Sequence, residues 1–222
     1  GNGEPRWTDQ IKAIAGASYP NAFRKLGVPA PTAALTVTVG TTGDHTGLFP
    51  GDYYYTYTYV TVDNEESAPA PVSQRLVRYV NDSAVLSDFT PPPAGYTSVV
   101  NRVRVYRTQT GSEATSFFFL REDPVSGLTT LEDDNRQLQE VLETKGWLPP
   151  PADLKCLTGM WGGMMAGISG RGIRLCEPNV AYAWPIAYEY VPLHYTPVAL
   201  GTFGQNLVVL TNGAPMILSG TA

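Results

Sequence analysis

A run of alternating tyrosines and β-branched residues limits, more than any other feature, what this chain can fold into. Residues 53–62 read YYYTYTYVTV, and the tyrosines at the odd-numbered positions share one face if the run is a strand. Aromatic and β-branched side chains favour pleated sheets over helices. The 22 glycines and 19 prolines supply turns between such runs, so the sequence predicts an all-β protein.

Other short apolar runs recur at intervals of roughly ten residues, a spacing typical of a β-sandwich. Further strands are expected at residues 35–39, 72–80, 99–108, 117–120 and 128–131. Residues 136–144 are expected to form either a short helix or an extended tail. We therefore predict a β-sandwich over residues 34–145, preceded by an N-terminal segment of residues 1–33 in which 7–17 form a short helix.

A proline-rich linker is predicted at residues 146–153, because three consecutive prolines hold a chain in a stiff, extended conformation. Residues 154–222 then read as a β-meander. Asn212-Gly213, between two apolar runs, is a strong signal for a hairpin. The meander is similar to part of a β-propeller, which needs about four or more blades to close. Its last three strands are expected at residues 198–203, 207–210 and 216–219.

The charge of the chain excludes some partners. With 15 basic and 20 acidic residues, the formal net charge is −5, and no long basic run is present. We therefore expect no specific binding of nucleic acid through its phosphates, and DNA at most passing through an assembly. No apolar run approaches the roughly 18–20 residues of a membrane span. Arg102 and Arg104, two apart on a strand, are expected to lie on a solvated face.

The few histidines and cysteines give no recognisable metal or nucleophile motif. His45 and His194 are the two histidines of the sequence, and Cys156 and Cys176 are its two cysteines. Structural zinc sites need three or four ligands at short spacings, which these residues lack. The stretch 167–171 approaches the nucleophile-elbow motif but has arginine where the last glycine belongs. We expect two buried thiols, with a disulfide between them as the geometrically possible alternative, and neither a metal nor a cofactor.

Acidic residues occur in adjacent groups at 65–66, 122–123 and 132–134. A glycosidase needs two carboxyl groups that face each other about 5–9.5 Å apart, whereas neighbours in a polar turn point apart into solvent. We expect plain solvated turns here. The alternative is a Ca²⁺ site at Asp63, Glu65 and Asp133, if their loops converge. The sequence therefore predicts no enzyme.

Aromatic residues are the remaining candidates for function. The tyrosine stripe of residues 53–59 is expected to pack the sandwich core or a subunit contact, with an exposed sugar-stacking stripe as the alternative. Tyrosine and tryptophan are enriched where proteins bind partners. The residues predicted to contact a partner are Tyr54, Tyr96, Trp184 and Tyr188.

Several stretches resemble a known group of proteins. Residues 53–67 (YYYTYTYVTVDNEES) and 103–115 (VRVYRTQTGSEAT) resemble fibronectin type III-like modules embedded in bacteriophage virion proteins. Later stretches, among them 203–211 (FGQNLVVLT), are similar to a blade of the propeller in phage tail and nozzle proteins. The resemblance covers about residues 28–222.

The resemblance implies a non-catalytic structural component of a virion tail, in the nozzle or tail tube region. Such a component packs in a ring of identical copies beside other virion proteins. Two alternatives remain open: a cell-surface or glycan-binding module that contacts a host, and an accessory domain of a larger enzyme. Because the sequence begins without Met and stops after about one blade, we expect a processed chain or a piece of a longer one.

Overall fold

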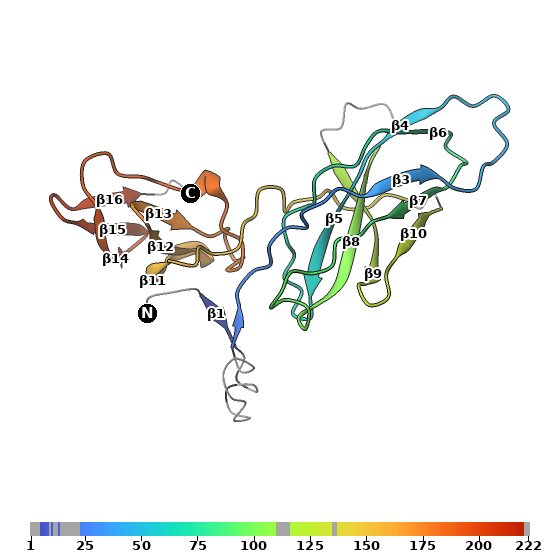
Figure 1. Ribbon diagram of the computed structural model, residues 1–222. Helices are drawn as coiled ribbons and strands as arrows, with labels where there is room; N and C mark the ends of the chain where they lie inside the picture. Colours follow the sequence, from blue (N-terminus) through green and yellow to red (C-terminus); the bar gives the residue numbers. More distant parts are fainter. Residues whose placement is uncertain are drawn as a thin grey trace. The chain divides into compact units, whose positions relative to one another are not determined.

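The computed structural model describes residues 5–8, 10, 13, 23–109, 116–134 and 137–219. Over these residues the protein is all-β, as the sequence predicts (Figure 1). The chain divides into two compact units. Residues 28–145 form the first, here called the sandwich unit, and residues 1–27 together with 146–222 form the second, here called the composite unit.

The sandwich unit consists of antiparallel sheets around one core. Its strands are β3 (Thr36–Val39), β4 (Gly51–Tyr53), β5 (Tyr55–Thr61), β6 (Leu76–Arg78), β7 (Ala84–Ser87), β8 (Val100–Thr108), β9 (Phe117–Pro124) and β10 (Thr130–Asp133). One sheet has the order β5-β8-β9, a second the order β10-β7-β3, and β4 pairs with β6. Both three-stranded sheets contribute side chains to the same core, which gives the unit its sandwich-like character.

The tyrosine stripe of β5 lies in this core. Tyr55, Tyr57 and Tyr59 are almost fully buried, and the rings of Tyr57 and Tyr59 meet edge to face with centroids 6.0 Å apart. The Tyr59 hydroxyl donates to the Thr90 carbonyl at 2.7 Å, while the Tyr57 hydroxyl accepts from the Thr90 N–H at 2.9 Å. Buried tyrosines need such partners for their hydroxyls. The stripe is therefore a packing feature and offers no exposed stack for a sugar.

Residues 67–73, here called the strap, run along the free edge of β5. N–H groups three residues apart donate to alternate β5 carbonyls at 2.8–3.0 Å: Ser67 to Tyr59, Ala70 to Tyr57 and Ser73 to Tyr55. The hydroxyls of Ser67 and Ser73 accept from the two β5 N–H groups of Tyr59 and Tyr55. A spacing of three suits the polyproline conformation that Pro69 and Pro71 favour. The strap thus satisfies an edge that would otherwise stay open.

Some elements of the sandwich unit differ from the sequence analysis. β7, which the sequence pattern does not predict, is the central strand of its sheet and pairs with both β3 and β10. The strand expected at 72–80 shrinks to β6, because residues 72–73 belong to the strap. Among the described residues of 136–144 the chain is extended, and Val141 forms a bridge to Phe118.

The composite unit contains two three-stranded antiparallel sheets and a two-stranded one. Its strands are β1 (Arg6–Trp7), β2 (Arg24–Lys25), β11 (Lys155–Gly159), β12 (Met165–Ser169), β13 (Gly172–Leu175), β14 (Pro197–Phe203), β15 (Asn206–Thr211) and β16 (Met216–Ser219), with 3₁₀ turns η1 (Trp161–Gly163) and η2 (Ile186–Tyr188). The sheets have the orders β1-β2, β11-β12-β13 and β14-β15-β16. The two larger sheets share a core in which Ala166, Ile173, Leu207 and Val209 are fully buried.

A second cluster covers the other face of the β11-β12-β13 sheet. Leu154, Cys176 and Trp184 form it, and Leu154 lies directly over Gly167. The predicted linker of residues 146–153 packs within the composite unit, where the Leu148 carbonyl accepts from the Trp184 N–H at 2.8 Å. Most of the helix predicted over 7–17 lies outside the described residues; Gln10 and Ala13 are helical, and the first residue, Trp7, belongs to β1.

Candidate interaction sites

The four aromatic residues predicted to contact a partner are divided between the units. Tyr54 and Tyr96 lie in the sandwich unit, and Trp184 and Tyr188 in the composite unit. Tyr96 and Trp184 are buried, and the Trp184 indole N–H donates to the Ala181 carbonyl at 2.9 Å. Tyr54 is half-buried and Tyr188 is exposed. Tyr96 and Trp184 have no surface to offer a partner, so the sites described below do not use them.

Asp133 is the centre of a buried ionic cluster. Its carboxylate accepts from Arg78 at 2.9 Å, from the Tyr55 hydroxyl at 2.8 Å and from Arg107. The side chains of Arg78 and Asp133 are 0% exposed. Both guanidinium groups also lie over the Tyr53 ring, at 4.3 and 5.5 Å from its centroid. Burial, followed by the charge of Asp133, raises the pKa of Tyr55, so this phenol stays protonated as a donor.

A second ionic cluster covers the threonine face of the β5-β8-β9 sheet. The Glu66 carboxylate accepts from the hydroxyls of Thr58 and Tyr106 at 2.7 and 2.6 Å and from Arg104 at 2.7 Å. Glu122 accepts from Arg104 at 2.6 Å and from Arg102 at 2.7 Å. The expectation of solvated acidic turns is therefore wrong for Glu66, as it is for Asp133 and Glu65. Arg104 on β8 pairs with both Glu66 and Glu122, and Arg102 pairs with Glu122, so Arg102 and Arg104 are not on a plainly solvated face.

The Glu122 ion pairs are expected to make the sandwich unit less stable in acid. Burial raises the pKa of Glu122, but hydrogen bonds from Arg104 and Arg102 outweigh it and hold the pKa below its usual 4.5. A lowered pKa stabilises the folded state above pH 4.5, and that contribution disappears as the pH falls through the folded-state pKa. Denaturation by urea should show Glu122→Gln about 1 kcal/mol less stable than the wild type at neutral pH. The difference should disappear as the pH falls through the folded-state pKa, and a pH-independent difference would contradict the assignment.

The remaining chemical candidates are structural. His45 contacts the buried Asp82 at 2.6 Å and stacks on Tyr79 with ring centroids 3.8 Å apart, which fastens the loop after β3. Ser169 ends β12 in a hairpin, and its hydroxyl donates to Asp153 at 2.7 Å. The two cysteines are free thiols; Cys176 is buried, as expected, whereas Cys156 is only half-buried.

The described residues contain neither a metal-binding cluster nor a membrane-spanning helix. No group of three or more His, Cys, Asp or Glu side chains in residues 5–8, 10, 13, 23–109, 116–134 and 137–219 is arranged to hold a metal ion. The Ca²⁺ alternative at Asp63, Glu65 and Asp133 therefore finds no converging loops in the structure. In the same residues, no helix is both long and apolar enough to cross a membrane.

The β14-β15-β16 sheet presents an uncharged face to solvent. Residues opposite one another on neighbouring strands share a face. The face turned away from the core, here called the outer face, consists of Ala199, Gly201, Phe203, Asn206, Val208, Leu210, Ile217 and Ser219. None of these side chains, all of them described, carries a charge. Phe203 is 76% exposed and Ile217 63%, while Val208 lies between Gly201 and Ile217 in the register.

The outer face is exposed, whereas the inner face of the same sheet is buried. On the inner face Leu207 and Val209 are fully buried against the β11-β12-β13 sheet. Single exposed apolar residues are ordinary, so the contiguous apolar row across three strands is the unusual feature of this sheet. The sequence itself indicates that both faces of β15 are apolar. LVVL at 207–210 is a continuous apolar run, and such runs are typical of strands covered on both faces.

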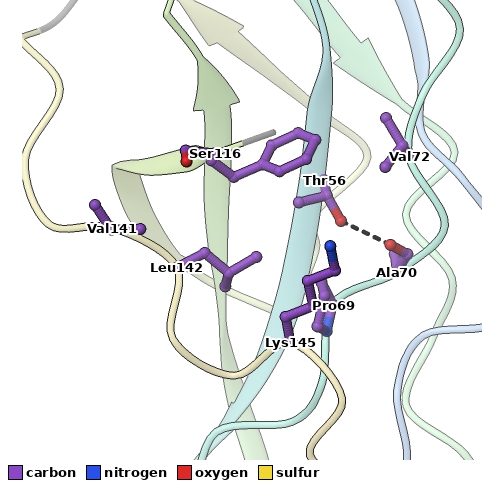
Figure 2. Close-up of a pocket in the computed structure, with 9 residues that line it drawn as sticks. Thr56, Pro69, Ala70, Val72, Ser116, Val141, Leu142 and Lys145 are labelled. Atoms are coloured by element: carbon purple, nitrogen blue, oxygen red, sulfur yellow. Dashed lines mark hydrogen bonds between the residues drawn. The ribbon is translucent and has the colours of Figure 1, made fainter. Parts of the chain in front are cut away.

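The sandwich unit contains a pocket of about 360 Å³, here called the strap pocket (Figure 2). It is lined by Thr56, Pro69, Ala70, Val72, Ser116, Phe117, Val141, Leu142 and Lys145. Most of the wall is apolar. Figure 2 shows the Lys145 side chain reaching into the pocket, with its nitrogen directed toward Thr56. No sequence pattern predicts this pocket, because its walls come from β5, the strap, the start of β9 and the segment after β10.

The outer face and the strap pocket therefore offer different chemistry. The first is a broad uncharged surface, and the second is a small apolar hollow with one cation. Comparison with known proteins finds no family model and no curated protein that matches the chain. The interpretation of both sites thus rests on their own residues.

Proposed function

We propose that this protein is a non-catalytic structural component of a bacteriophage virion, in the nozzle or tail tube region of the tail, and that it acts through contacts between subunits. The outer face of the β14-β15-β16 sheet carries the proposal. Exposed apolar surface is unfavourable in water, so a partner surface that covers it is held by the hydrophobic effect. The resemblance of residues 53–67 and 103–115 to modules of virion proteins supports the phage context.

The partner proposed for the outer face is a second copy of the chain. A side chain added at Gly201 would meet no atom within 4 Å, so this position is an open hollow beside the projecting Phe203 ring. A surface that carries both a projection and a hollow can complement itself in a symmetric pair, where each copy contacts the other in the same way. The absence of charge on the face means that two copies do not repel each other there.

The expected strength of a single contact is modest. Burying a Phe, Ile or Leu side chain contributes about 1.5–3 kcal/mol. Association costs about 4–15 kcal/mol in lost rotation and translation. Burying Phe203, Leu210 and Ile217 of both copies therefore contributes a free energy only slightly larger than the cost of association. Assemblies with several contacts per copy gain much more, because later contacts form within an existing complex.

The double variant Phe203→Asp with Ile217→Asp is expected to weaken self-association by at least about 100-fold, since it places two charges in an apolar contact. The matched control is Phe49→Asp, which changes a still more exposed residue (89%) in the sandwich unit and should leave assembly unchanged. Analytical ultracentrifugation and electron microscopy of the full-length protein measure both. The proposal is supported if the wild type forms rings or tubes and the double variant does not. A monomeric wild type, or a double variant that assembles like the wild type, contradicts it.

A further inference from the structure

The strap pocket has chemistry that subunit assembly through the outer face does not use. Its volume lies at the lower end of the range of about 300–1,000 Å³ that is typical of ligand pockets. The walls near its opening include Val72 and Val141, both about half exposed. An apolar group therefore fits inside, and the apolar surface continues past the opening.

The donors that remain available in the pocket favour an anion. The Thr56 hydroxyl already donates to the Ala70 carbonyl at 2.8 Å, so Lys145 and Ser116 are the side chains that can donate to a ligand. Among the described residues, no carboxylate forms an ion pair with Lys145. Lys145 is exposed, so its ammonium is accessible to a carboxylate at the mouth of the pocket.

We propose that the strap pocket binds the carboxyl-terminal residue of a partner polypeptide, with an apolar side chain in the pocket and the terminal carboxylate on Lys145. Three features favour a chain end over a free acid. The pocket is large enough for an apolar side chain, its single cation matches a single carboxylate, and the half-exposed Val72 and Val141 continue the apolar surface for the residues that precede the terminus. Capture of a terminal carboxylate is an established mode of peptide recognition.

Three small probes distinguish this proposal from its alternatives. The first is N-acetyl-Ala-Leu with a free carboxylate, the second its carboxyl-terminal amide, and the third hexanoate. Binding to the full chain is followed by NMR chemical-shift changes at Thr56, Ala70 and Leu142. The free peptide is expected to bind in about the millimolar range that ligands of this size reach. The amide and hexanoate should each bind at least about tenfold more weakly.

Lys145→Met tests the cation directly. It should weaken binding of the free peptide by about tenfold and leave the amide unaffected. Lys155→Met, the same change in the composite unit, should alter the binding of neither the free peptide nor its amide. Equal binding of peptide and amide, tighter binding of hexanoate, or no shifts at the three pocket residues would each overturn the proposal. The acid-to-amide comparison on the wild type needs no variant, and none of these outcomes depends on whether copies associate through the outer face.

Discussion

Replacing Asp133 with Asn is expected to destabilise the sandwich unit by about 3–5 kcal/mol. Asp133 is fully buried and accepts hydrogen bonds from Arg78 and Arg107. The substitution keeps the shape of the side chain but removes its negative charge from beside two buried guanidinium groups. Each of those groups gave up its hydration on folding, and an amide oxygen returns only part of that free energy.

The matched control is Asp52→Asn in the same unit. Asp52 also pairs with an arginine, Arg75, but both side chains are about half exposed. Such a pair contributes about 0–1 kcal/mol. All four tryptophans lie in the composite unit, so far-ultraviolet circular dichroism has to report the sandwich unit while tryptophan fluorescence reports the other. Equal decreases in the free energy of unfolding for the two variants would refute the role given to the buried cluster.

Trp184→Ala is expected to destabilise the composite unit by about 3–5 kcal/mol, because it removes a fully buried ring and leaves a cavity. Trp184 fills the cluster with Leu154 and Cys176 that covers one face of the β11-β12-β13 sheet. Its loss also leaves the Ala181 carbonyl without the indole donor. The effect should therefore exceed that of an equal loss of apolar area at the surface.

Trp161→Ala supplies that comparison in the same unit. Trp161 lies in η1 and is 72% exposed, so its removal should change the free energy of unfolding by no more than about 0.5 kcal/mol. Urea denaturation followed by the remaining tryptophans gives both values. Hydrogen exchange in β12 and β13 should accelerate in Trp184→Ala alone. Comparable destabilisation by the two variants would show that Trp184 is not the centre of its cluster.

The sequence predicts the strands of this protein well where the side-chain pattern is long. β5, β8 and β14 to β16 appear close to their expected positions, because alternation and the Asn212-Gly213 turn signal act locally. β7 was not predicted because its four residues lie between polar turns, although Ala84 and Leu86, two residues apart, are both buried. Its central position is a tertiary feature, since it is set by pairing with β3 and β10, which come from before and after it in the chain.

The charged residues were harder to predict than the strands. Asp133 belongs to a run of acidic residues that has the composition of a solvated turn, yet its partner Arg78 lies 55 residues away. No local pattern reveals a partner at that distance, and the same holds for the strap pocket. The outer face is an intermediate case, because its residues lie on predicted strands. The sequence does not indicate which face of these strands is exposed, because the other face is buried by the β11-β12-β13 sheet.

The strap along β5 limits how another molecule can contact this edge of the sheet. A bare strand edge recruits the edge of a neighbouring molecule, and the process has no natural end. Here the residues that occupy the edge include Pro69 and Pro71, which have no N–H to extend the ladder outward. Pairing of a further strand with β5 is thereby blocked. Any contact with another molecule at this edge has to be made by side chains.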